Sequence, residues 1–188
     1  MNYEVAQKFP VPDLAVVMDR LAAAGVAVSE PMLEIDFYWN HPSRDFAATD
    51  EALRIRQADT GQAGPVSRMT YKGPKIDTVT KTRRELELNL EAAQTADWAE
   101  MLEALGFRRV AEVRKQRRKA FMEWQDRRVE ISLDDVAEVG SFVELELIAD
   151  EEGLPSARNC LATLAEHLSL TVTERRSYLQ LLLQTRTG

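Results

Sequence analysis

Apolar and polar residues alternate with a period of two along most of the chain, and a few stretches of helical spacing interrupt this alternation. The helical pattern predicts four helices, at about residues 13–24, 96–105, 156–168 and 174–184. The alternation predicts nine strands: Tyr3–Phe9, Met32–Trp39, Ala52–Gln57, Val66–Lys72, Thr82–Leu90, Val110–Lys119, Ala120–Gln125, Arg128–Asp134 and Phe142–Ala149. Many strands in hairpin order with few helices indicate an α+β fold whose sheet curls or closes.

The polar positions of these strands are unusual because most of the strands carry charges of one sign there. Arg54 and Arg56 alternate with apolar residues in one strand, and Glu144 and Glu146 do so in another. Residues two apart share a face of a strand, about 6–7 Å from each other, so like charges there repel. The same-face sets are Glu4 with Lys8, Arg54 with Arg56, Lys72, Glu85 with Glu87, Lys115 with Arg117, Glu130 with Asp134, and Glu144 with Glu146.

Two interpretations of this face remain open. In the first, the charged face is a solvated outer surface and the apolar face packs on a core. In the second, the apolar face points outward under the helices and the charged face lines the lumen of a closed barrel. A wet lumen of this kind would hold a polyanion, with Lys and Arg on phosphate oxygens and carboxylates on Mg²⁺ or Mn²⁺.

Composition limits the possible classes of protein. With 188 residues, 45% of them hydrophobic, the chain fits a single domain spanning residues 1–188. A formal net charge of −7 argues against nucleic-acid binding. One cysteine, Cys160, excludes an intrachain disulfide and a cysteine-built metal site. The absence of a long apolar run and of a signal-like start predicts a cytoplasmic protein that does not bind membranes.

Several segments, in order along nearly the whole chain, match the motifs of a known family. They are 3–9 (YEVAQKF), 36–39 (DFYW), 51–56 (EALRIR), 70–74 (TYKGP), 83–87 (RRELE), 105–107 (LGF), 113–117 (VRKQR), 131–134 (ISLD) and 140–146 (GSFVELE). The chain resembles the CYTH superfamily, the triphosphate tunnel metalloenzymes, and within it the class IV adenylate cyclase branch.

This resemblance implies a fold and a set of roles. The fold would be a closed or nearly closed eight-stranded antiparallel β-barrel, a tunnel with helices packed outside. The cyclase branch converts ATP to cyclic AMP and pyrophosphate with Mg²⁺ or Mn²⁺, and its members suggest a homodimer. The triphosphate would be bound by Lys8, Arg54, Arg56, Lys72, Lys115 and Arg117. Lys8, Lys115 and Arg117 are the expected catalytic residues, Glu4, Asp134, Glu144 and Glu146 the expected metal ligands, and Glu85, Glu87 and Glu130 possible additional acids.

One position departs from the family pattern. The second acid of the N-terminal motif is replaced by Ala6, and Gln7 points to the opposite face of a regular strand. A missing carboxylate weakens or displaces one metal ion. Alternatives to the cyclase therefore stay open: a hydrolase of triphosphate or thiamine triphosphate, a catalytically weakened polyphosphate or nucleotide binder, or a structural domain with a solvated charged sheet.

Overall fold

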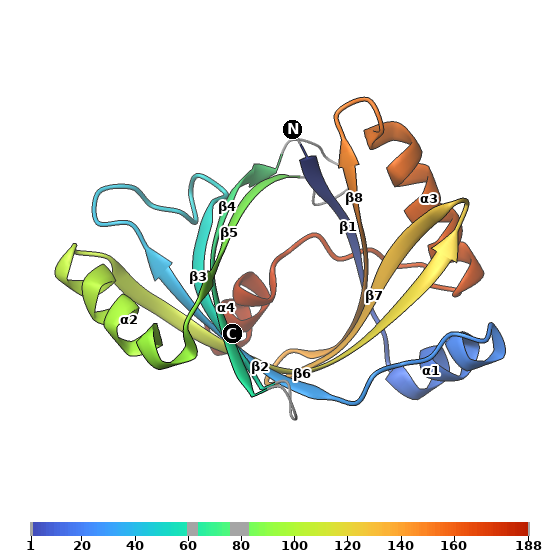
Figure 1. Cartoon of the computed structure of the whole chain (residues 1–188), viewed down its shortest axis with the longest axis horizontal. Coiled ribbons are helices and arrows are strands. Elements are labelled where there is room, and N and C mark those ends of the chain that lie inside the picture. Colours follow the sequence, from blue (N-terminus) through green and yellow to red (C-terminus); the bar gives the residue numbers. More distant parts are fainter. Residues whose placement is uncertain (1, 60–63, 76–82, 188) are drawn as a thin grey trace.

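The computed structural model describes residues 2–59, 64–75 and 83–187, and their strands form a closed antiparallel barrel (Figure 1). The order around the barrel is β1-β5-β4-β3-β2-β6-β7-β8, and β8 pairs back onto β1. The strands are β1 (Asn2–Pro10), β2 (Met32–Asn40), β3 (Ala52–Asp59), β4 (Pro65–Lys75), β5 (Arg83–Leu90), β6 (Arg108–Trp124), β7 (Arg127–Val136) and β8 (Gly140–Asp150). The α+β barrel predicted from the sequence is confirmed.

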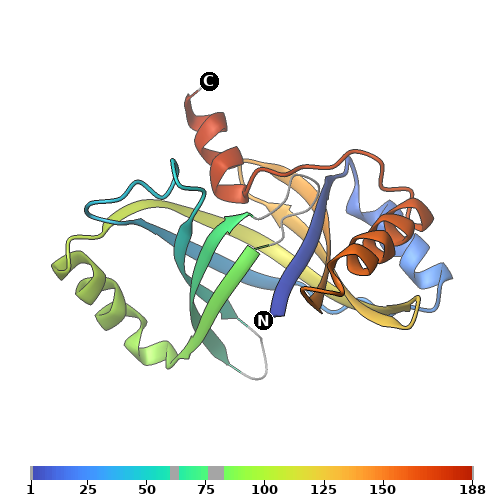
Figure 2. The same cartoon turned by 90° about the horizontal axis from the view of Figure 1, so that it is seen from above.

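Three helices cover the outside of the barrel. α1 (Leu14–Ala23) and α3 (Leu154–His167) pack over β1, β7 and β8, whereas α2 (Thr95–Ala104), preceded by the short 3-10 helix η2 (Ala92–Gln94), lies on the opposite side (Figure 2). The outward residues Val5, Val143 and Leu145 are buried beneath α1 and α3. No helix among the described residues is long and apolar enough to cross a membrane.

The fourth helix, α4 (Tyr178–Thr187), closes one end of the barrel instead of covering its outer face. Tyr178, Leu181 and Leu182 belong to an apolar cluster with Val113 and Phe142, which alternate with outward-facing residues on β6 and β8. The inner face of the barrel is therefore apolar where α4 docks. The expectation that all helices pack outside is refined accordingly.

Two predicted boundaries were wrong for physical reasons. The predicted strands Val110–Lys119 and Ala120–Gln125 are one 17-residue strand, β6. The predicted fourth helix begins at Tyr178, not at residue 174, because the amide of Glu174 donates to the carbonyl oxygen of Lys8 at 2.7 Å and holds this segment extended along β1. Thr82, the first residue of one predicted strand, lies outside the described residues.

The register of the sheet places charged residues opposite one another on the inner face. Lys8 lies opposite Glu144, Lys72 opposite Glu85, and Asp36 opposite Arg56. Since the intervening residues form the outer cores, the interpretation with the charged face inside the barrel is confirmed and the solvated outer sheet is wrong.

Candidate active site in the barrel lumen

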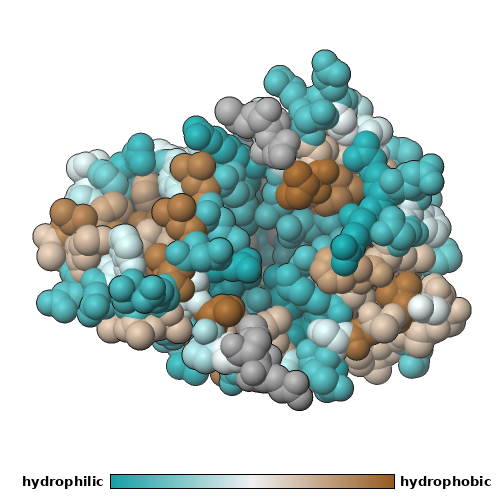
Figure 3. All heavy atoms as spheres, viewed as in Figure 1, coloured by the Kyte–Doolittle hydropathy of each residue, from teal (hydrophilic) through white to brown (hydrophobic). Residues whose placement is uncertain are grey.

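A cavity of about 640 Å³ lies within the barrel, and a hydrophilic hollow marks it at the centre of the molecule (Figure 3). Among the described residues that line it, ten are basic and eight acidic. The lining therefore has an excess of positive charge, although the chain as a whole has a net charge of −7. A cavity of this kind attracts anions without depending on the charge of the outer surface.

Most of the residues predicted for the site line this one cavity. They are Glu4, Lys8, Arg54, Arg56, Lys72, Glu85, Glu87, Arg117, Glu130, Glu144 and Glu146. The other two, Lys115 and Asp134, are fully buried behind the wall and do not line the cavity. The structure thus brings together residues from β1, β3, β4, β5, β6, β7 and β8.

The basic side of the cavity is built on a buried carboxylate, Asp36. Its two oxygens accept from Nε and Nη2 of Arg56 at 2.6 and 2.8 Å. Nζ of Lys115 donates to it at 3.0 Å, and Nη1 of Arg54 lies at 3.4 Å. Burial alone would raise the pKa of Asp36, but the charges of Arg56, Lys115 and Arg54 hold it well below its ordinary value. Asp36 is therefore an anion beneath three cations.

Glu34 supports the same group of cations from the next inward position on β2. Its Oε2 lies 2.9 Å from Nζ of Lys115 and 3.0 Å from Nη1 of Arg56. Burial opposes ionisation, yet Lys115, Arg56 and Arg117 lower the pKa of Glu34 to about 2. Lys115 is enclosed by these groups, and burial together with the charge of Arg56 lowers its pKa. Its ammonium is therefore easier to deprotonate than that of an exposed lysine.

Arg117 connects the cavity wall to helix α4 through Asp134. Its Nε and Nη2 donate to the two oxygens of Asp134 at 2.6 and 2.5 Å, and Nη2 lies 3.5 Å from Glu144. The hydroxyl of Tyr178 donates to the same Asp134 at 2.7 Å. Burial and the charge of Asp134 raise the pKa of Tyr178 well above its ordinary value, so this hydroxyl keeps its proton. Asp134 thus anchors an arginine and a helix.

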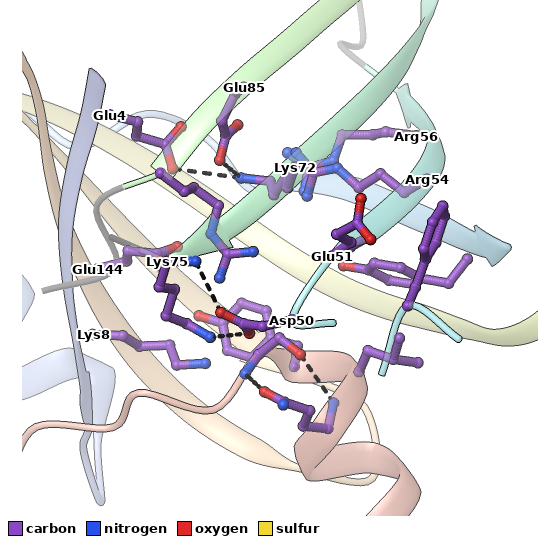
Figure 4. Close-up of a pocket in the computed structure, with 18 of the residues that line it drawn as sticks. Glu4, Lys8, Asp50, Glu51, Arg54, Arg56, Lys72, Lys75, Glu85 and Glu144 are labelled. Carbon is purple, nitrogen blue, oxygen red and sulfur yellow. Dashed lines mark hydrogen bonds and ion pairs between the residues drawn. The ribbon is translucent and has the colours of Figure 1, made fainter. Parts of the chain in front are cut away.

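On the opposite wall, Lys72 points between two acids (Figure 4). Its Nζ is ion-paired with Glu85 and lies 3.4 Å from Glu4. Nearer the end closed by α4, Nζ of Lys75 donates to Asp50 at 2.6 Å. Both lysines face the cavity with an acid beside them, which partly neutralises them before any ligand binds.

Lys8 is positioned by the segment that leads into α4. Its Nζ donates to the carbonyl oxygen of Arg176 at 2.6 Å and lies 3.9 Å from the ring centre of Tyr178. A cation over an aromatic face is stabilised electrostatically. The ammonium of Lys8 is therefore held at the same end of the cavity as the first residue of α4.

The acidic side of the cavity has the donor chemistry for a hard divalent cation. Burial and the charges of Glu4, Glu144 and Glu130 raise the pKa of Glu146 well above its ordinary value. A cation among these carboxylates would relieve that repulsion, and their oxygens are the ligands that Mg²⁺ and Mn²⁺ prefer. The residues fit such an ion chemically, although no three acidic, histidine or cysteine side chains in the described ranges already form a metal-binding group.

Sequence reasoning missed the two buried acids, Glu34 and Asp36, as parts of the site. They lie two apart in a strand of apolar neighbours, the same pattern that identified Glu85 with Glu87. It also missed Arg83, which lies two positions before Glu85 on β5, and Lys75, which follows a register shift after Lys72 on β4. The two-residue spacing was present for the acids on β2 and for Arg83, and it was absent for Lys75.

Comparison with known proteins agrees with this geometry. The CYTH domain matches residues 2–178. This chain belongs to the CYTH domain family. A protein of Methanocaldococcus jannaschii named "putative adenylate cyclase" is 37% identical over 143 residues, covering 76% of this chain and 75% of the relative.

Two solved structures resemble this CYTH domain along almost its whole length. The PH1819 protein of Pyrococcus horikoshii is 36% identical with a TM-score of 0.87, and the match covers 97% of this chain and 99% of that one. A "putative adenylate cyclase" of Vibrio parahaemolyticus is 25% identical with a TM-score of 0.77, over 96% of this chain and 98% of that one.

Proposed function

We propose that this CYTH protein is a metal-dependent adenylate cyclase that binds ATP in the barrel cavity and forms cyclic AMP and pyrophosphate. One observation carries the proposal: the cavity that holds the cations is also lined by aromatic and aliphatic side chains. These are Trp39, Phe46, Val110, Leu179 and Leu183. Inorganic triphosphate would need only the charged part, whereas a nucleoside triphosphate would use both.

The triphosphate would be bound by Lys8, Arg54, Arg56, Lys72 and Arg117, all of which line the cavity. Guanidinium groups suit this task because they bind phosphate oxygens in a bidentate manner. Nε of Arg54 is buried and has no hydrogen-bond acceptor among the described residues, so its guanidinium has unused donor capacity. Lys115 would contribute its charge from behind the wall.

In the proposed reaction the ribose 3′-oxygen attacks the α-phosphorus, and the bond from that phosphorus to the oxygen bridging the α- and β-phosphates breaks. Pyrophosphate leaves with the bonding electron pair. The proton of the 3′-hydroxyl would pass to Lys8 once its amine has left the carbonyl oxygen of Arg176 and lost its own proton. Arg54, Arg56 and Arg117 would stabilise the charge that develops on the phosphates.

A divalent cation would be bound by Glu4, Glu144 and Glu146, with Glu130 nearby. When bound, Mg²⁺ or Mn²⁺ would supply charge stabilisation at the leaving pyrophosphate. We assign Asp134 a smaller part in metal binding than the sequence predicted, because both of its oxygens already accept hydrogen bonds from Arg117 and Tyr178.

Product analysis tests the proposal directly. The protein is incubated with ATP, thiamine triphosphate or inorganic triphosphate, each with Mg²⁺ or Mn²⁺, and the products are separated by chromatography. We expect cyclic AMP and pyrophosphate from ATP. Phosphate release without a cyclic product would replace the cyclase with a hydrolase. The Arg54→Ala, Arg56→Ala double variant should lose the activity.

A catalytically weakened nucleotide binder is the second candidate, and Ala6 favours it. Ala6 is buried on the inner face and lies directly opposite Glu146, so the missing acid would have belonged to the acidic side of the cavity. ATP binding by calorimetry with no turnover in either metal would support this candidate. Substantial turnover by the wild-type protein would reject it.

A further inference from the structure

We propose that Asp36 is a positioning residue that fixes the guanidinium groups of Arg54 and Arg56 for phosphate binding. The inference rests on the proposed function, because it assigns these two arginines to the triphosphate. It concerns a buried carboxylate whose place at the centre of the basic wall only the structure reveals.

Asp36 contacts several cations on the basic side of the cavity. Arg56 forms a bidentate pair with it through Nε and Nη2, at 2.6 and 2.8 Å. Nη1 of Arg54 approaches Oδ2, the oxygen that also accepts from Lys115 at 3.0 Å. One carboxylate thus contacts three of the six cations that the sequence predicted for the triphosphate.

Asp36 acts from behind the wall and not on the ligand. Its side chain is 1% exposed and does not line the cavity, whereas Arg54 and Arg56 do. The acid therefore lies inside the barrel wall, and the two arginines that donate to it also line the lumen. A phosphate could reach the arginines without displacing Asp36.

The register of β2 and β3 explains why Asp36 lies beside both arginines. Asp36 pairs directly with Arg56 across the two strands, and Arg54 is the next inward residue on β3. Two guanidinium groups on one face of one strand repel each other, and a carboxylate between them offsets the repulsion. A bidentate carboxylate pair also fixes the plane of the guanidinium group of Arg56, which leaves Nη1 of that group to Glu34 and the cavity.

The test compares two effects of opposite sign. If Asp36 only neutralised the wall, then Asp36→Asn would add positive charge and tighten the binding of a polyanion. If Asp36 positions the arginines, the same change should weaken binding, because their guanidinium groups lose a fixed orientation. We expect Asp36→Asn to raise the dissociation constant for inorganic tripolyphosphate about tenfold or more, as measured by titration calorimetry in the presence of a metal chelator.

Glu138→Gln is the matched control. It removes an equal charge from a carboxylate that pairs with an arginine, Arg186, on the outer surface. Binding should change less than twofold in this variant. Equal or tighter binding in Asp36→Asn than in the wild type would overturn the inference.

Asp36→Asn could instead disturb the fold, which circular dichroism and thermal unfolding would reveal. A second variant therefore tests the same inference. Asp36→Glu keeps the charge but moves the carboxylate by one methylene group. Positioning predicts weaker binding, whereas wild-type affinity in this variant would reject it. The proposed function can fail independently of this inference. If the wild type binds tripolyphosphate but makes no cyclic AMP, the cyclase proposal is refuted and the affinity comparison still tests the role of Asp36. If the wild type does not bind tripolyphosphate, the cyclase proposal and the role of Asp36 are both refuted.

Discussion

Glu34 shows how the folded barrel changes the ionisation of a single acid. Three cations lower its pKa to about 2 from an ordinary value of 4.5, despite its burial. A depressed folded-state pKa contributes stability that is fully present above the unfolded value and is lost as pH falls through the folded value. The window for this loss therefore lies between pH 4.5 and about 2.

We predict that Glu34→Gln lowers the free energy of unfolding at pH 7 by about 3 kcal/mol, because buried Lys115 and Arg56 lose a counter-charge. The difference from the wild type should shrink as pH falls from 4.5 toward 2, where Glu34 itself becomes protonated. Urea unfolding at a series of pH values measures both effects. Glu103→Gln, on the exposed face of α2, serves as the control. A difference that stays constant over this range would contradict the prediction.

Ala6 offers a second test at the scale of one residue. Because it lies opposite Glu146, Ala6→Glu would add a carboxylate to a group of acids that already raise the pKa of Glu146. We expect the variant to be less stable than the wild type in a chelator, by about 1–3 kcal/mol. Mn²⁺ or Mg²⁺ should restore more stability to the variant than to the wild type, as thermal unfolding would measure.

The control for this prediction is Ala93→Glu, the same substitution at an exposed position of η2. It should show no metal dependence beyond that of the wild type. If Ala6→Glu were equally stable with and without metal, the acidic side of the cavity would not be the metal site.

Among the secondary-structure elements, α4 is joined to the barrel by a buried hydrogen bond from Tyr178 to Asp134. Tyr178→Phe removes this bond, but Asp134 keeps both bonds from Arg117, so no buried charge is left unpaired. We expect a loss of about 1 kcal/mol, concentrated in the docking of α4. Hydrogen exchange of the amides in 178–187 should become faster in the variant.

Tyr3→Phe is the comparison for this change, since the structure gives the Tyr3 hydroxyl no hydrogen bond to any other described residue. It should leave exchange in α4 unaltered. Unchanged exchange in Tyr178→Phe would mean that the apolar contacts of Leu181 and Leu182 alone hold the helix.

β6 shows why the sequence predicted two strands where the structure has one. Its residues alternate regularly, with Lys115, Arg117 and Lys119 on the inner face. The outer face is exposed at Arg114, buried at Ala120 and partly buried at Met122 and Trp124, because α1 and α3 cover only the second half. The apolar pattern therefore changes phase at residues 118–119 although the strand continues, and only the positions of the helices reveal this.

The inner face of the barrel was predictable for a similar physical reason. Same-sign pairs such as Arg54 with Arg56 could be recognised because side-chain direction alternates strictly along a strand. Which acid pairs with which base was not predictable. Asp36 contacts Lys115, 79 positions away, only because closure of the barrel places β6 beside β2. The position of α4 at one end of the barrel was not predictable either, since its apolar residues resemble those of a helix that covers the outer face.

For the whole molecule, closure of the barrel concentrates cations inside an otherwise acidic protein. A ligand that neutralises them should stabilise the folded state, because only the closed barrel brings the residues of the cavity together. At a concentration 100 times its dissociation constant, a ligand of the native state adds about 2.7 kcal/mol to the free energy of unfolding. We therefore predict that inorganic triphosphate raises the melting temperature of the wild type by several degrees, and that added salt reduces this shift.

The Arg54→Ala, Arg56→Ala double variant should lose most of the shift, because two of the cations that line the cavity are gone. Arg114→Ala with Arg118→Ala removes the same charge from the outer face of β6 and should retain it. Thermal unfolding with and without triphosphate, at low and at high salt, distinguishes the two double variants. An equal loss in both would mean that the ligand responds to net charge and binds outside the barrel. A loss confined to the inner pair would instead assign the stabilisation to the lumen, where the same arginines hold the phosphates in the proposed reaction.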